Sequence, residues 1–125
     1  MILIDTHTLI WLLSASDKLS DKAKEMLKSG DKTYVSIASI WEIAIKQSIG
    51  KLELTYSVDD IVNKCQSYKI DILPIKPAHI EYIKSLPFIH RDPFDRLLIS
   101  QAKIEGLTFI SKDENIAKYD ITVVW

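Results

Sequence analysis

Hydrophobic positions along the chain fall into short continuous runs separated by longer segments with helical spacing. A continuous run of aliphatic residues is typical of a strand buried on both faces of a sheet. The first such run, Ile2–Ile4, leads directly into Asp5. The predicted strands are Ile2–Ile4, Thr33–Ser36, Asp71–Ile75, Leu107–Ile110 and Ile121–Trp125.

Between these runs, apolar residues recur at spacings of three and four, and glycines follow several segments, which is the pattern of helices. The predicted helices are Thr6–Leu13, Leu19–Gly30, Ile37–Ile49, Val58–Tyr68, Pro77–Leu86 and Asp92–Gly106, with a short helix after Asp113. Alternating strands and helices predict an α/β fold, a three-layer α/β/α sandwich with a mainly parallel central sheet. We expect Ile2–Ile4 and Leu107–Ile110 to be central strands, and Pro74 to mark a strand end or an edge.

Composition agrees with one globular domain over residues 1–125. The chain is 47% hydrophobic and 26% charged, which excludes a disordered chain, and no apolar run is long enough for a membrane span. No export signal is visible, and the single cysteine, Cys65, fits a reducing cytoplasm. The net charge of −1 gives no basic excess for binding nucleic acid, so a polyanionic substrate would need local neutralisation, for example by a divalent metal.

Several carboxylates occur where a binding site can form. Asp5 and Asp113 each follow an apolar strand and so lie at the carboxyl edge of the predicted sheet, where open α/β folds bind ligands. Glu42 interrupts an apolar helical stripe, although an exposed pair with Lys46 at a spacing of four would also explain it. Asp5 and Asp113 could equally be simple helix N-caps.

Two further acids begin the helix after the Pro87–Arg91 loop. Asp92 precedes Pro93 and suits an N-cap, which leaves Asp95 in the first turn, directed outward from a helix N-terminus. Four converging carboxylates repel one another unless cations bind, and hard oxygen ligands favour Mg²⁺ or Mn²⁺. The chain has no Cys/His cluster with zinc spacing and no glycine-rich phosphate loop.

Four motifs in this order resemble the PIN domain, and more narrowly the VapC-type toxins of bacterial toxin–antitoxin operons. The resemblance spans nearly the whole chain. The motifs are Ile2–Thr6, Ser39–Ile43, Arg91–Ile99 and Ile110–Asp113.

This resemblance implies a Mg²⁺- or Mn²⁺-dependent endoribonuclease that acts as a toxin. The four acidic positions of the family, which are both metal ligands and catalytic residues, correspond to Asp5, Glu42, Asp95 and Asp113. Asp92 is a second acid in the third motif, and we prefer Asp95 because it directly precedes the apolar helix. The resemblance also implies a homodimer, an RNA substrate and an inhibiting antitoxin protein.

Substrate contacts are expected from hydroxyl and basic side chains near the acids. Thr6 and Ser111 match hydroxyl positions of the family, and Arg96 is the first basic candidate, followed by Arg91, Lys46 and Lys112. His90 could contact RNA or transfer a proton, or it could be an ordinary loop histidine.

Two other functions are considered for this chain. A Mg²⁺-binding receiver domain of a signalling pathway has a similar length and alternation, but it needs adjacent acids after the first strand, where this chain has Thr6. A PIN-domain nuclease for RNA processing would keep the fold and the four acids and differ only in its partners.

Overall fold

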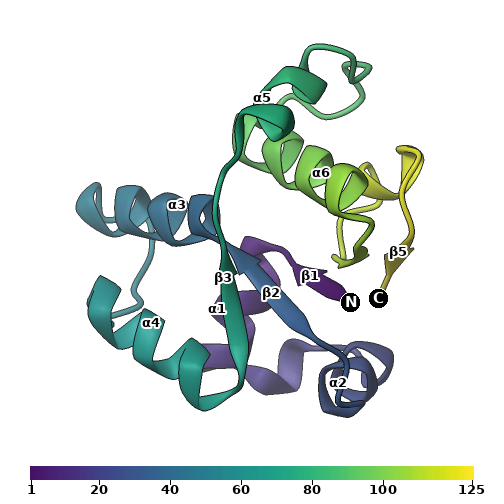
Figure 1. The fold of residues 1–125 in the computed structure, drawn as a ribbon. Helices are drawn as coiled ribbons and strands as arrows, with labels where there is room; N and C mark the ends of the chain where they lie inside the picture. Colours follow the sequence, from purple (N-terminus) through teal and green to yellow (C-terminus); the bar gives the residue numbers. More distant parts are fainter.

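The computed structural model describes residues 1–125 as a parallel sheet with helices on both faces (Figure 1). The strands are β1 (Ile2–Ile4), β2 (Thr33–Ser36), β3 (Ile70–Leu73), β4 (Thr108–Ile110) and β5 (Val123–Val124). The helices are α1 (Thr6–Ser14), α2 (Asp21–Lys28), α3 (Ile37–Ser48), α4 (Val58–Ser67), α5 (Pro77–Ile83) and α6 (Pro93–Glu105). Single 3-10 turns lie at Ser16–Lys18 and Ile116–Lys118.

The sheet has the strand order β3-β2-β1-β4-β5, and every pair of neighbours is parallel. Ile2 of β1 lies opposite Thr33 of β2 on one side and Thr108 of β4 on the other. Both β1 and β4 are therefore interior strands, as their continuous apolar character predicts. Pro74 follows β3, which is an edge strand, so the prediction for this proline is also confirmed.

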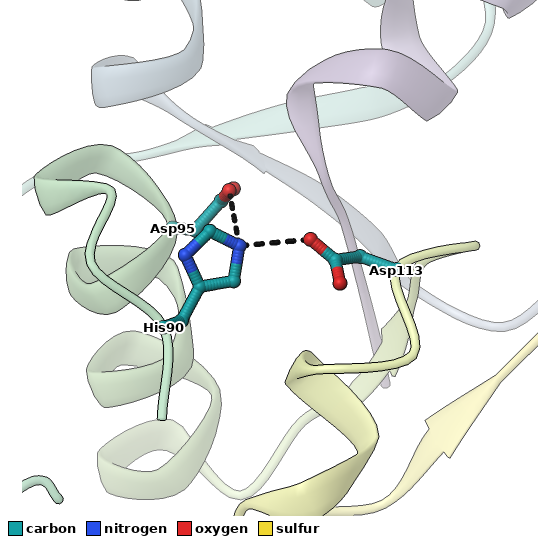
Figure 2. Close-up of side chains that lie close together, drawn as sticks. All are labelled: His90, Asp95 and Asp113. Atoms are coloured by element: carbon teal, nitrogen blue, oxygen red, sulfur yellow. Dashed lines mark hydrogen bonds and ion pairs between the residues drawn. The ribbon is translucent and has the colours of Figure 1, made fainter. Parts of the chain in front are cut away.

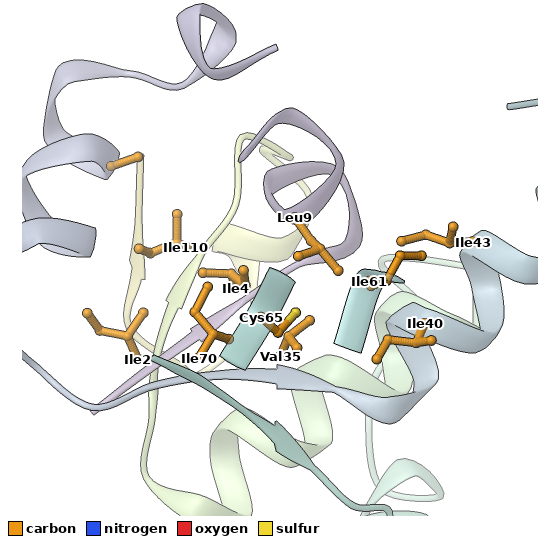
Figure 3. Packing of buried hydrophobic residues seen from close by; sticks show 11 residues of the cluster. Ile2, Ile4, Leu9, Val35, Ile40, Ile43, Ile61, Cys65, Ile70 and Ile110 are labelled. Atoms are coloured by element: carbon orange, nitrogen blue, oxygen red, sulfur yellow. The ribbon is translucent and has the colours of Figure 1, made fainter. Parts of the chain in front are cut away.

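Two hydrophobic clusters, one on each face of the sheet, make this a three-layer α/β/α sandwich. Alternate residues of β1 point to opposite faces, so Ile2 and Ile4 join one cluster and Leu3 joins the other. The first cluster includes residues of α1 to α4, such as Leu9 and Ile61 (Figure 3). The second is formed with α6 and the segment after β4. Burial on both faces fixes the strand ends, and with them the carboxyl edge of the sheet.

The helix boundaries follow local capping chemistry. Side chains of Asp5, Ser20, Ser36, Ser57 and Asp92 each accept a hydrogen bond from a backbone N–H in the first turn of the helix that follows. Gly106 ends α6 with φ of 67°, a left-handed conformation that glycine adopts without strain.

Several predicted boundaries were too generous, including the strand predicted at Asp71–Ile75, which the structure has at Ile70–Leu73, and the helix predicted at Leu19–Gly30, which covers Asp21–Lys28. Helix α5 ends at Ile83 rather than at Leu86, and Arg96 donates to the carbonyl oxygens of Ile83 and Leu86 where the helix stops. The short helix after Asp113 is a single 3-10 turn, and the last strand covers only Val123–Val124. None of the helices has both the length and the apolar run that a membrane crossing requires.

Candidate active site

The carboxyl edge of the sheet holds an open hollow of about 280 Å³. Asp5 follows β1 and Asp113 follows β4, and these neighbouring parallel strands end at the same edge. The first turn of α6 brings Asp95 to the same place. The hollow is lined by Asp5, His7, Trp11, Asp95, Lys112 and Asp113. Three of the four predicted acids therefore share one hollow.

Asp5 has both of the roles considered for it. Its Oδ1 accepts a hydrogen bond from the Thr8 backbone N–H at 2.8 Å, so it caps α1. Its side chain also lines the hollow, although the residue is only 5% exposed. A carboxylate has about four lone-pair sites, so the capping bond leaves capacity for a further ligand.

Glu42 is buried within α3, and its carboxylate has two partners. Its Oε1 accepts a hydrogen bond from the Thr6 hydroxyl at 2.7 Å, and its Oε2 lies 2.9 Å from Lys46 Nζ. The ion pair with Lys46 therefore exists, but the residue is 6% exposed and is not the solvated surface acid that this alternative required. Glu42 does not line the hollow itself. Thr6 also hydrogen-bonds to Ser39, so this hydroxyl fixes the Glu42 side chain against α1.

The third motif separates its two acids by role. Asp92 Oδ1 accepts hydrogen bonds from the backbone N–H groups of Phe94 and Asp95, at 2.8 and 3.2 Å, and so caps α6. The Asp95 side chain does not cap the helix, and it lines the hollow. The predicted N-cap at Asp92 is confirmed.

Asp95 stands out electrostatically. Burial raises its pKa from 3.8 to about 7, and repulsion from the charges of Asp92, Asp5 and Glu42 adds to this, while His90 opposes it. Three neighbouring carboxylates thus act on Asp95, including Glu42 from outside the hollow. A charged group in this position is destabilised until positive charge arrives.

His90 contacts two of the acids. Its Nε2 lies 2.8 Å from Asp113 Oδ2 and 3.1 Å from Asp95 Oδ2, as Figure 2 shows. Its Nδ1 accepts a hydrogen bond from the Asp92 backbone N–H at 3.1 Å. Because Nδ1 is the acceptor, the ring hydrogen is on Nε2 and points between the two carboxylates. His90 is therefore part of the acidic centre and not an ordinary loop histidine.

The pKa of Asp113 lies below its usual value. Partial burial acts to raise this pKa, but hydrogen bonds from the Asn115 backbone N–H and from the His90 ring outweigh it. The Ser111 hydroxyl accepts a hydrogen bond from the Asp113 backbone N–H at 3.1 Å. Ser111 is buried and shapes the turn that presents Asp113.

Arg96, which we predicted to contact substrate, has a structural role in the segment between α5 and α6. Arg96 is 6% exposed, and its guanidinium donates to the carbonyl oxygens of Ile83, Leu86 and Pro87 at 2.9 to 3.3 Å. It also lies over the Phe88 ring, 4.2 Å from the centroid. One residue beyond Asp95 on a helix is a rotation of about 100°, which directs Arg96 into the loop and away from the hollow.

Several site residues were missed from the sequence. His7 and Trp11 line the hollow, and Tyr119 holds the loop that carries His90 through its hydroxyl, which accepts from the His90 N–H at 2.9 Å. The spacing of four between His7 and Trp11 was a usable signal, because it places both on one helix face next to Asp5. Tyr119 follows β4 and is far from His90 in the chain, so no local sequence pattern predicts their contact.

Comparisons with known proteins agree with this geometry. A family model described as the PIN domain matches residues 2–121. No curated protein matches the chain by sequence. Among solved structures, a toxin–antitoxin complex from Klebsiella pneumoniae is similar, with 18% identity and a TM-score of 0.68 over 100% of this chain and 97% of that chain.

Two further structures have the same fold. VapBC2 from Rickettsia felis, bound to a DNA fragment from its promoter, has 14% identity and a TM-score of 0.70, covering 99% of this chain and 98% of that one. FitAcB from Neisseria gonorrhoeae has 17% identity and a TM-score of 0.67, covering 100% and 97%. The family match covers most of the chain, so this protein belongs to the PIN domain family, whose members are nucleases.

Proposed function

We propose that this protein is a metal-dependent endoribonuclease and the toxin of a toxin–antitoxin pair. The observation that carries the proposal is the convergence of Asp5, Asp95 and Asp113 on one hollow, with Glu42 close enough to raise the pKa of Asp95. Repulsion among carboxylates would only destabilise a purely structural cluster. A nuclease that cleaves phosphodiesters, in contrast, needs a bound cation where these carboxylates meet.

The donor set fits Mg²⁺ or Mn²⁺. Asp5, Glu42, Asp95 and Asp113 supply carboxylate oxygens, which hard divalent ions prefer, and no thiolate lies in the hollow. When bound, the ion would offset the charge of the scissile phosphate and activate the attacking water. Asp5, Asp95 and Asp113 would hold it, and Glu42 would act from beside the hollow, positioned by Thr6 and Lys46.

His90 would occupy the cation position in the protein without metal. Its Nε2–H donates to Asp113 and lies 3.1 Å from Asp95 Oδ2, so the ring places a donor between the two carboxylates. An ion entering between these carboxylates must displace the ring, because the bond from Asp92 keeps a hydrogen on Nε2. A displaced ring would be available to donate its Nε2–H to a phosphate or to a leaving oxygen.

The toxin role rests on the similar structures, two of which are described as a toxin–antitoxin complex and as VapBC2. On this proposal an antitoxin protein inhibits the nuclease in the cytoplasm. A role in RNA processing would use the same site without such a partner. Co-expression with the product of a neighbouring small gene, followed by purification, separates the two roles, because only a toxin forms a stable inhibited complex.

We further propose a homodimer formed through α3. Ile37, Trp41, Ile45 and Ile49 follow one another at a spacing of four and form one exposed apolar stripe. Trp41 is 59% exposed and contacts the Phe94 ring at 5.1 Å between centroids. Such a stripe marks an interface in soluble proteins.

Light scattering is expected to give twice the chain mass of 14.3 kDa. Trp41→Glu should halve this mass, because a charge placed in the stripe has no partner across the interface. A monomer at high concentration for the unaltered protein would contradict the dimer.

The activity is tested with a structured RNA and protein dialysed against EDTA. We expect no cleavage after dialysis and full recovery when Mg²⁺ or Mn²⁺ is added back. Recovery should not occur with Na⁺ at equal ionic strength, because the carboxylates need a divalent ion to neutralise them. Cleavage that persists in EDTA would exclude the proposed chemistry.

A further inference from the structure

An aromatic row begins in the wall of the hollow, which both His7 and Trp11 line. The His7 and Trp11 rings stack with 5.9 Å between centroids and 24° between planes. Trp125 continues the row, 5.6 Å from Trp11 at 55°. The row therefore consists of His7, Trp11 and Trp125, and its His7 end adjoins Asp5 in the chain.

The sheet brings these rings together. His7 and Trp11 lie one turn apart on α1, directly after β1, and Trp125 directly follows β5. The Ser111 backbone N–H donates to the Val124 carbonyl at 3.2 Å, which holds the end of β5 beside the exit of β4. The aromatic row and the acidic centre thus share the carboxyl edge of the same sheet.

Core packing explains only one end of the row. Trp125 is half-buried and packs against the first hydrophobic cluster. His7 is exposed and Trp11 is half-buried, and both line the hollow that holds the acids. An exposed ring stacked on the end of an aromatic row offers a free face for another planar group.

Lys112 places a positive charge beside the aromatic row. Its Nζ lies over the Trp11 ring, 5.8 Å from the centroid, and its side chain lines the hollow. Lys112 also lines a second open hollow of about 380 Å³, together with Trp125. A cation in this position attracts a phosphate and repels a guanidinium. A divalent ion held by the three carboxylates of the hollow would act in the same direction, which favours a nucleotide over an arginine side chain as the planar guest.

We propose that the aromatic row and Lys112 form a subsite for one unpaired nucleobase next to the scissile phosphate. Base stacking on aromatic side chains and a nearby cation are the usual means of binding single-stranded nucleic acid. The inference rests on the proposed nuclease function, because it names the substrate as RNA that is unpaired beside the cleaved bond. A base inside a duplex is stacked on its neighbours through both faces and so cannot stack on His7.

The test compares adenosine 5′-monophosphate with ribose 5-phosphate in Mg²⁺. The two ligands differ only in the base, and neither has a phosphodiester to cleave. Trp41 is on α3 and does not line the hollow, and the Trp41→Phe variant leaves Trp11 and Trp125 as the only fluorescent indole groups. We expect the nucleotide to quench this fluorescence and to bind about tenfold or more tightly than ribose 5-phosphate.

Variants made in this background identify the surface. His7→Ala should weaken nucleotide binding by about fivefold or more and leave ribose 5-phosphate unchanged, and His7→Phe should restore the affinity. Tyr68→Ala is the matched control, because Tyr68 is an exposed aromatic residue before β3, at the opposite edge of the sheet. It should change neither affinity.

Equal affinities for the two ligands, or a His7→Ala variant with unchanged nucleotide binding, would overturn the subsite. Quenching by arginine amide in place of the nucleotide would also overturn it and assign the row to a peptide partner. Metal-dependent RNA cleavage separates the two proposals. If the protein cleaves RNA but binds the two ligands equally, only the subsite is contradicted. If it prefers the nucleotide but does not cleave RNA, the nuclease function is contradicted instead.

Discussion

Replacing Asp95 with Asn is expected to lower the rate of RNA cleavage by about 10²-fold or more, because a lost anionic ligand costs several kcal/mol of charge stabilisation. The same change should stabilise the protein without metal. Asp95 is destabilised by burial and by its acidic neighbours, and the neutral amide removes that cost. We expect a gain of about 1–2 kcal/mol at pH 8, measured by thermal unfolding in EDTA.

The pH dependence of this stability has a defined sign. The folded-state pKa of Asp95 is raised from 3.8 to about 7, so the folded protein retains a proton that the unfolded chain releases. The resulting stability is fully present below about pH 4 and is lost as the pH rises to about 7. Asp95→Asn should remove this pH-dependent loss, whereas the unaltered protein should show it in EDTA.

Asp92→Asn is the matched control for the third motif. Asn caps a helix about as well as Asp, so the hydrogen bonds to Phe94 and Asp95 remain. We expect activity within a fewfold of the unaltered protein. A dead Asp92→Asn variant together with an active Asp95→Asn variant would reverse the assignment of the two acids.

Replacing Arg96 with Ala is expected to destabilise the fold by about 3–4 kcal/mol. The guanidinium satisfies carbonyl oxygens of the loop between α5 and α6, and its removal leaves several of them buried without donors. The loop carries His90, so its loosening should also disturb the acidic centre. Denaturant unfolding measures the loss.

Arg91→Ala is the control for Arg96, because Arg91 is exposed in the same motif. It should change stability by less than about 0.5 kcal/mol. Arg96→Lys should lie nearer to the alanine variant, since a single ammonium cannot match the fork geometry of the guanidinium. A stable Arg96→Ala variant whose only defect is a raised KM for RNA would reinstate Arg96 as a substrate contact.

The parts of the site that follow strands were predictable from the sequence. Asp5 comes directly after an apolar run and Asp113 three residues after one, and the parallel order of β1 and β4 places them together. Asp92 and Asp95 were separable because Asp-Pro is a helix start with known capping chemistry. Local patterns of this kind depend only on neighbouring residues.

Side chains that reach across the fold were not predictable in the same way. Arg96 follows Asp95 in the chain, yet it points into the loop at Ile83–Phe88. His90 is in a loop with no periodicity, and only the packing of Tyr119 against it reveals its position. Trp125 joins Trp11 through strand pairing between β4 and β5, which the sequence does not encode locally.

Calorimetric titration of Mn²⁺ into the unaltered protein, Asp5→Asn and His90→Ala tests the central claim most directly. Asp5→Asn keeps the cap of α1 and loses one charge, so Mn²⁺ binding should weaken by about tenfold or more. His90→Ala removes the group that competes for Asp95 and Asp113, so binding should tighten by about threefold or more. Equal affinities in all three proteins, or no saturable binding in any of them, would contradict a metal centre at this hollow.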